Sequence, residues 1–506
     1  MSSNEKDTLA ADSADFSLAR IFLWISVVLV TAGTLGGLGI VEPLVVTALT
    51  VALLLALVVI RSPDLAIFLV VFVLYSNIAV VAVHFHGVPK AVAAAFPLLL
   101  GVPLVRNLVF RRQGLLLDPT ALFILAFIAV QTVGLAFSKN PAAGKPVILQ
   151  HLLEGLLIYL LVLNVVRTEK NLRLATWGLL LAGLVIGAFP VLQQLTGSFH
   201  NQFGGMAQTG EFGFRTGEWT AQGEGRQIRM SGPIGEENRY AQIMLMLVPL
   251  AFLRFMGERK RPLRTLALFC LGFAGLGVLL AFSRGAVLSL ALIFILAVCM
   301  RVVKGRALAL ALLLGLAVLV SLPQVWTRLS SVADLGMFAS GNRTSEVDSS
   351  IRGRATEMIA AAQIFVDHPV VGAGPGMYRE YSREYGNRLG IRKLHESRRA
   401  HSLYLEIAAE NGALGLSILL GMFYVTLSGL VVVRRRWHRE RPDLANMATA
   451  YLLAVSCYLV SGIFLHMSYV RFIYLILALA GAAIAIARRE AARSPALEAR
   501  NDGGEP

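Results

Sequence analysis

The sequence predicts an all-α, polytopic membrane protein with about 14 transmembrane helices. First, 56% of the 506 residues are hydrophobic and only 15% are charged, whereas about a quarter of the residues in a soluble domain are charged. Second, the apolar residues gather in runs of about 17–25, the length that crosses a bilayer as a helix. Third, basic residues lie in short segments between these runs, so the net charge of +15 does not indicate nucleic-acid binding.

The predicted spans follow one another along the chain, separated by short polar or basic segments. They cover residues 21–39, 43–60, 64–84, 88–108, 119–137, 146–166, 172–195, 240–256, 264–282, 285–303, 306–322, 412–434, 446–465 and 470–487. Two longer polar segments interrupt the series, at 196–239 and 323–411. We expect loops of this length to be functional or disordered.

The distribution of basic residues predicts the topology. With both termini inside, Lys and Arg crowd the inner segments, while the short outer loops hold only Lys90, Lys139, Lys145, Arg284 and Arg471. This asymmetry is typical of cytoplasmic termini. The expected organisation is a cytoplasmic tail (1–19), transmembrane helices (20–195), a first outer loop (196–239), transmembrane helices with a Ser-Arg-Gly motif (240–322), a large outer loop (323–411), transmembrane helices (412–487) and a second tail (488–506). We expect Met1–Ala19 and Ala491–Pro506 to be disordered.

The large outer loop has an internal pattern. Residues 351–366 place Met358, Ile359, Ala362 and Phe365 on one helical face, which predicts an amphipathic helix on the outer membrane surface. Asp367-His368-Pro369 ends this helix, because proline cannot continue it. The stretch VVGAGPGMY follows, and its glycines predict a tight turn.

Four stretches on the outer side carry a family resemblance. They are RMSGPIGEENRYAQIMLMLVPL from Arg229, AFSRGAVLSL around Arg284, IRGRATEMIAAAQIFVDHPVVGAGPGMY from Ile351, and RRAHSLYLEIAAENGALGL from Arg398. In order and spacing, from about Thr196 to Arg434, the chain resembles the O-antigen ligase and polymerase superfamily. The fourth stretch departs from the family pattern, since Ser402 follows His401 where the family commonly has asparagine.

The resemblance implies an enzyme of the bacterial inner membrane with its active site in the periplasm, so that the two outer loops are periplasmic. Such enzymes move a glycan from undecaprenyl pyrophosphate to an acceptor glycan or glycolipid. Membrane lipid is a further expected partner, whereas no cofactor and no nucleic-acid partner is expected. Arg229, Arg284 and Arg352 match the family's arginines, which implies pyrophosphate binding, and His401 matches the catalytic histidine. Arg354, Asn238 and Glu410 are expected to support them.

The chemistry suits these residue types. Arginine stays protonated and grips phosphate oxygens with two donors at once, although such a residue can also merely anchor at the interface, as we expect for Arg239. Histidine can accept a proton near neutral pH, and Arg398 and Arg399 would keep His401 uncharged. Alternatively, His401 only caps or packs in a loop. His466 is a further candidate for the same cavity.

The carboxylates of the fourth stretch fit a different role. On an ideal helix Glu410 lies about 180° from His401, so a structural role is expected, and Glu410-Asn411-Gly412 is typical of a helix end. No cluster has metal-ligand spacing and no carboxylate is evident as a covalent nucleophile. We therefore expect metal-independent transfer with inversion at the anomeric carbon.

Two subtypes and one rival class stay open. A polymerase, slightly favoured, would extend one lipid-linked repeat with another in O-antigen or exopolysaccharide synthesis. A ligase would transfer the glycan to lipid A-core or another terminal acceptor. A transporter of polysaccharide or lipid-linked glycan would also suit many spans, but transporters place functional charges at mid-membrane rather than at its outer boundary.

Overall fold

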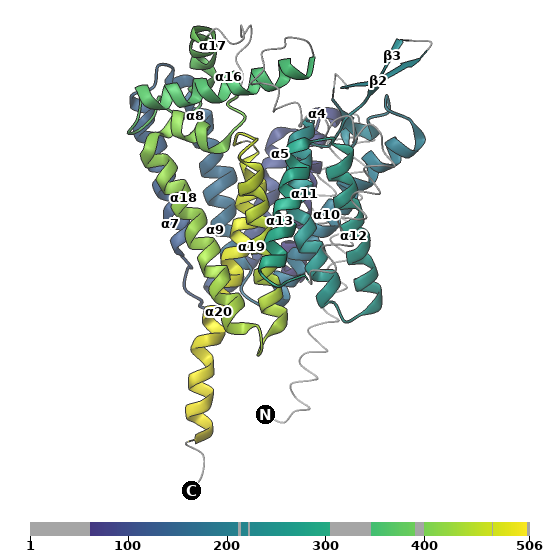
Figure 1. Ribbon diagram of the computed structural model, residues 1–506. Coiled ribbons are helices and arrows are strands. Elements are labelled where there is room, and N and C mark those ends of the chain that lie inside the picture. Colours follow the sequence, from purple (N-terminus) through teal and green to yellow (C-terminus); the bar gives the residue numbers. More distant parts are fainter. Residues whose placement is uncertain are drawn as a thin grey trace, which may run out of the picture.

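A bundle of long apolar helices, crossed at one end by a helix lying over it, dominates the structure (Figure 1). The computed structural model describes residues 61–210, 214–220, 223–303, 346–389, 399–467 and 469–502. A fold that satisfies backbone hydrogen bonds within each span is what a bilayer requires. The predicted all-α polytopic membrane class is confirmed.

Within the described ranges, nine helices are long and apolar enough to cross a membrane. They are 90–110 (α5 Lys90–Ala95, η1 Phe96–Leu100, α6 Gly101–Val105, η2 Arg106–Phe110), α7 (Pro119–Ala136), 141–165 (α8 Pro141–Gln150, η3 His151–Leu157, α9 Ile158–Val165), α10 (Glu169–Thr196), α11 (Glu237–Gly257), α12 (Arg261–Leu280), α18 (Leu403–Trp437), α19 (Pro442–Ser461) and α20 (Val470–Asp502).

The other predicted spans have three different outcomes. Residues 64–84 form two helices, α3 (Pro63–Ser76) and α4 (Ile78–His86), bent by 56°. The bend lies at Asn77, whose left-handed backbone (φ 62°) ends α3. The predicted span 285–303 is the shorter helix α13 (Arg284–Cys299). The predicted spans 21–39, 43–60 and 306–322 lie outside the described residues.

Local sequence signals start several of these helices. The side chains of Asp118, Asn140, Thr168 and Ser283 each accept a hydrogen bond from a backbone N–H in the first turn of the helix that follows. Proline occupies the first turn of α7, α8, α12 and α19, where its missing N–H costs nothing.

Three helices form the centre of the bundle. The apolar windows of α20, α19 and α11 are 89%, 83% and 72% buried, against 33% for α12 and α18. α11 packs on α12 and α19, and α18 packs on α7 and α19. The loops that join or precede the central helices are therefore held in fixed positions, and these loops build the candidate site.

Ion pairs join several chain segments at one end of the bundle. At the end away from α16 (Glu346–Asp367), hereafter the far end, the segments predicted to be cytoplasmic come together through ion pairs. Arg441 lies 2.8 Å from Glu169 and 3.3 Å from Glu490, and Arg173 lies 3.2 Å from Asp443. That this end faces the cytoplasm stays a prediction from the charge pattern of the sequence.

The first outer loop contains short strands that the sequence analysis did not predict. β1 (Gln208–Thr209) pairs antiparallel with β4 (Met230–Gly232), and β2 (Phe214–Thr220) pairs antiparallel with β3 (Gly223–Gln227). The β2–β3 hairpin projects from the α16 end of the bundle (Figure 1). The backbone N–H of Gly210 donates to the carbonyl of Arg229, which fixes the backbone just before β4.

The predicted amphipathic helix is α16, and it ends at Asp367 as expected. α16 lies across the end of the bundle, with α17 (Tyr378–Arg388) beside it (Figure 1). Its Ala360, Ala361 and Ile364 are buried against the protein, whereas Ile359 is 41% exposed. The predicted apolar face is thus the less buried face, and a different face carries the packing.

The glycine-rich turn is tight because it pairs with a break in α18. Gly412 has φ 64° and ψ −167°, so the helix end predicted at Glu410-Asn411-Gly412 is a break inside α18. The N–H groups of Ala373 and Gly374 donate to carbonyls before the break, and that of Ala413 donates to Pro369. A Cβ on Gly372 would lie 2.3 Å from the carbonyl carbon of Glu410.

Two predicted boundaries are wrong. α18 begins at Leu403, so the large outer loop ends before residue 411, because a separate helical stretch precedes the break at Gly412. α20 continues to Asp502, so Ala491–Asp502 is helical rather than disordered. The helix extends beyond the bundle at the far end (Figure 1). The predicted N-terminal tail, Met1–Ala19, lies outside the described residues.

Candidate functional site

A histidine and a carboxylate face each other at the α16 end. Nε2 of His401, just before α18, lies 3.4 Å from Oε2 of Glu357 on α16. The Glu357 side chain is 1% exposed and that of His401 is 23% exposed. A carboxylate in this position can orient the imidazole and stabilise its protonated form. Sequence reasoning missed Glu357.

Three arginines from separate elements converge beside this pair. Arg284, at the start of α13, interacts electrostatically with both Arg229 and Arg354. Burial lowers the pKa of Arg354, and Glu357 opposes that shift, so Arg354 links the arginines to the histidine–glutamate pair. Like charges brought together in a partly buried site favour an anionic ligand.

The Ser-Arg-Gly motif presents Arg284 at a helix start. Oγ of Ser283 accepts a hydrogen bond from the N–H of Ala286 at 3.4 Å and caps α13. Arg284 is partly exposed and makes no ion pair within the described ranges. The helix N-terminus adds a positive partial charge to that of the guanidinium. Arg284 is therefore available to an incoming anion.

Arg229 is held more firmly than Arg284. Its Nε donates to the carbonyl of Ala281 at 2.9 Å, one of its terminal nitrogens donates to Asn238 at 2.9 Å, and the other lies 3.6 Å from Glu237. Burial lowers the pKa of Arg229, with Glu237 opposing and Arg354 adding to the shift. Asn238 thus positions Arg229, and its supporting role in a site stays a prediction.

α16 carries two candidate arginines, Arg352 and Arg354, and the structure describes the side chain of Arg354. The side chain of Arg352 lies outside the described residues. Arg354, expected only as a support, is the arginine that interacts with Arg284 and with Glu357. Three positions separate Arg354 from Glu357, a spacing that puts two side chains on one face of a helix.

A second layer of charged groups backs the site. Arg399 lies 3.1 Å from Glu406, so it is engaged by a carboxylate rather than simply repelling a proton from His401. Arg239 is 1% exposed, donates to Gln242 at 3.0 Å and also bonds the carbonyl of His466. The expectation that Arg239 anchors at the membrane interface is wrong, because the side chain is enclosed by protein.

His466 reaches the same place from the loop between α19 and α20. Its ring centroid lies 5.9 Å from that of His401. Burial lowers the pKa of His466, and Arg239, Arg399 and His401 lower it further. His466 is therefore neutral at physiological pH.

Glu410 does not face His401. Its Oε1 accepts a hydrogen bond from the N–H of Tyr378 at 3.2 Å, at the start of α17. Tyr378 in turn donates its hydroxyl to the carbonyl of Glu357 at 2.8 Å. Glu410 thus secures the glycine-rich turn and, through Tyr378, the backbone that carries Glu357.

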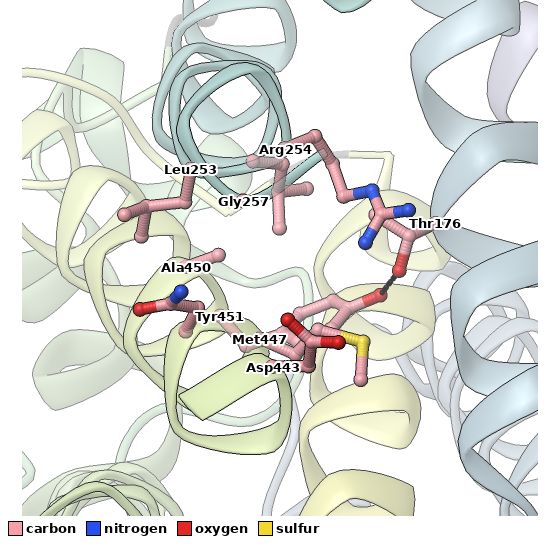
Figure 2. Close-up of a pocket in the computed structure, with 10 residues that line it drawn as sticks. Thr176, Leu253, Arg254, Gly257, Asp443, Met447, Ala450 and Tyr451 are labelled. Atoms are coloured by element: carbon pink, nitrogen blue, oxygen red, sulfur yellow. Dashed lines mark hydrogen bonds between the residues drawn. The ribbon is translucent and has the colours of Figure 1, made fainter. Parts of the chain in front are cut away.

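Another cavity lies far from these residues, between α10, α11 and α19 (Figure 2). Its volume is about 10 Å³, the room needed for about one water molecule. Thr176 and Tyr451 bond to each other across it at 2.8 Å. It is too small for a glycan. In the part of the chain that the structure describes, no group of three or more His, Cys, Asp or Glu residues could hold a metal ion.

Residues 266–420 match the family model of the O-antigen ligase. This stretch is an O-antigen ligase domain. The match confirms the superfamily seen in the sequence motifs. The O-antigen ligase domain includes Arg284, Arg354, Glu357, His401 and Glu410, whereas Arg229 and His466 lie outside it. A comparison with curated proteins found no match to the chain.

Proposed function

We propose that the protein is an inner-membrane glycosyltransferase that transfers or polymerises undecaprenyl-pyrophosphate-linked glycan at the periplasmic face. The observation that carries this proposal is the convergence of Arg229, Arg284 and Arg354 with the His401–Glu357 pair at one end of the bundle. The O-antigen ligase domain supports it, because that family acts on lipid-linked glycans.

In this proposal the arginines hold the donor pyrophosphate. Arg284 makes the main contact, since it lies at a helix start and has no carboxylate partner within the described ranges. Arg229 and Arg354 are close enough to Arg284 to interact with it electrostatically. As the glycosidic C–O bond breaks, the electron pair leaves with the pyrophosphate, and three guanidinium groups stabilise its growing charge. Arg352 is kept as a further candidate ligand.

His401 acts as the general base. The acceptor hydroxyl attacks the anomeric carbon on the side opposite the pyrophosphate, which inverts its configuration, and its proton passes to the imidazole. With Nε2 directed at Glu357, the neutral ring would take this proton at Nδ1. Glu357 then stabilises the imidazolium. The arginines supply the positive charge that a divalent cation would otherwise provide, so we propose metal-independent transfer.

A purified-protein assay with lipid-linked glycan in liposomes tests the proposal. His401→Ala should lower the rate by about 10²–10⁴-fold, and Arg284→Ala by about 10²–10³-fold, with both variants still folded. His438→Ala and Arg435→Ala, which change exposed residues at the far end, are the matched controls and should keep wild-type rates. Activity should persist in EDTA. Wild-type transfer by folded His401→Ala and Arg284→Ala variants would overturn the site assignment.

Glycan analysis of a deletion strain separates the two subtypes. We lean slightly to a polymerase of O-antigen or exopolysaccharide, whose loss leaves single repeats on the acceptor. Loss of a ligase instead leaves intact polymer on its lipid carrier. Ser402 directly precedes α18 and its carbonyl accepts a hydrogen bond from the N–H of Glu406, so its place in the fold does not favour either acceptor.

A further inference from the structure

A basic cavity of about 280 Å³ opens at the far end of the bundle, away from the candidate site. Its volume is just below the usual range for small-molecule sites, about 300–1,000 Å³. Four parts of the chain line it: η2 with the loop after it, the segment that leads into α10 and its first turn, the residue before α19, and the part of α20 from Ile486 to Arg493. Five arginines contribute to its wall: Arg111, Arg167, Arg441, Arg489 and Arg493.

The cavity's carboxylates are already engaged. Arg441 holds both Glu169, at 2.8 Å, and Glu490, at 3.3 Å. Arg493 lies 3.6 Å from Glu490 as well. In the described part of the chain, neither Arg111 nor Arg489 has a carboxylate partner. Two positive charges are thus left for a ligand.

A buried arginine fixes the wall on which Arg111 stands. Arg167 is 7% exposed and donates to the carbonyl of Gly114 at 2.9 Å and to the side chain of Gln113 at 3.3 Å. Burial lowers the pKa of Arg167, and repulsion from Arg489 lowers it further. The loop after η2 is therefore held in place while its positive neighbours repel one another, a state that a bound anion would relieve.

The surroundings of the cavity identify the source of that anion. Phe110, directly before Arg111, is 78% exposed, and Val109, Leu115 and Leu117 are 58–63% exposed. In a bilayer, exposed apolar side chains of this kind would contact the acyl chains of lipids. Basic pockets between transmembrane helices at the cytoplasmic side are suited to anionic headgroups. We propose that this cavity binds the phosphate group of an anionic phospholipid headgroup.

Lipid titration of the full chain tests this. Phosphatidylglycerol added to delipidated protein in a neutral detergent should raise the melting temperature. In the double variant Arg111→Gln/Arg489→Gln its apparent Kd should rise about tenfold or more. Both arginines lack carboxylate partners among the described residues, so the variant is expected to fold. The control Arg435→Gln/Arg439→Gln removes the same charge from exposed positions at the same end and should titrate like the wild type.

Inorganic phosphate, titrated in the same way, distinguishes the source. A rise in melting temperature with phosphate alone, lost in the double variant and absent with phosphatidylglycerol, would overturn the lipid assignment in favour of a soluble anion. If both ligands shift the melting temperature of the double variant as they shift that of the control, the proposed binding site is overturned. The glycan-transfer rate is not read, so the result is independent of the proposed function.

Discussion

At the scale of single residues, the site combines strained backbone with enclosed side chains. His401 has a φ of 49°, and Phe282, two residues before Arg284, has a φ of 48°. Left-handed backbone at a non-glycine residue costs about 1–3 kcal/mol and persists only where the surroundings fix it. The imidazole and the guanidinium are therefore placed by the fold before any substrate binds, as electrostatic catalysis requires.

Glu357→Gln tests the positioning role of this carboxylate. The amide keeps the shape but cannot stabilise the imidazolium, so kcat should fall on the order of 10²-fold while KM stays nearly unchanged. Steady-state kinetics with lipid-linked glycan measures both, and an unchanged melting temperature excludes a folding defect. Glu380→Gln, an exposed carboxylate on α17, is the control. A kcat within twofold of the wild type would refute the role of Glu357.

His466 predicts a pH dependence of stability. Because burial and its positive neighbours lower its pKa, the unfolded chain binds a proton on this histidine at a pH where the native protein does not. Stability should therefore fall below about pH 6.5, by about 1.4 kcal/mol per pH unit at most. The melting temperature should drop less between pH 7.5 and 5.5 in His466→Gln than in the wild type.

The exposed residue His438 provides the control for this measurement. His438→Gln should keep the wild-type loss of stability at pH 5.5. An equal loss in His466→Gln and in the wild type would show that the acid sensitivity resides elsewhere.

Sequence reasoning found most of the site because its residue types are dictated by chemistry. Arg229, Arg284 and His401 were predicted because binding pyrophosphate and accepting a proton restrict the choice of side chain. The structure places them at the α16 end, and their roles stay predictions. Glu357 was not predicted because the sequence does not distinguish it from the other carboxylates of this segment. Its contact with His401 arises only when the chain folds and α16 lies beside that histidine. Spacing alone could not decide whether Arg352 or Arg354 is the better candidate ligand, because that depends on how α16 is rotated about its axis.

At the scale of elements, length and hydropathy predicted the spans, and tertiary packing decided their ends. α18 starts nine residues before the predicted span because Leu403–Asn411 is helical and mostly buried, although it is not the most apolar part. The polar tail after Arg489 carries no hydropathy signal, yet it continues α20. The buried face of α16 escaped prediction because it is lined by alanines, threonine and Glu357 rather than by its bulkiest residues.

Gly412→Ala probes the break that fixes the glycine-rich turn. A Cβ at this position would lie 2.2 Å from the carbonyl oxygen of Val370, and φ is 64°. Strain and displacement together should lower the free energy of unfolding by about 2–4 kcal/mol. Thermal unfolding in detergent should show a clear drop in melting temperature. Gly275→Ala, where a Cβ meets nothing within 4 Å in helix α12, should be neutral or mildly stabilising.

At the scale of the whole molecule, the two ends of the bundle carry different groups of residues. The convergent arginines and the histidine–glutamate pair lie at the α16 end, while the loops predicted to be cytoplasmic gather at the far end with the basic cavity. In our proposals each end has a separate anionic partner: a lipid-linked pyrophosphate at the α16 end and a phospholipid headgroup at the far end. The charge rule read from the sequence predicted the segregation but not the cavity, which needs four chain segments in contact.

Site-directed labelling tests which end faces the periplasm. Because a basic end is retained in the cytoplasm, Glu380→Cys on α17 should react with a membrane-impermeant maleimide in cells with a permeabilised outer membrane. Arg439→Cys at the far end should react only after lysis. Both changes are made in a chain whose native cysteines, Cys270, Cys299 and Cys457, are replaced by alanine. Labelling of Arg439→Cys but not Glu380→Cys in unlysed cells would invert the topology, and a site facing the cytoplasm could not receive a donor presented on the periplasmic side.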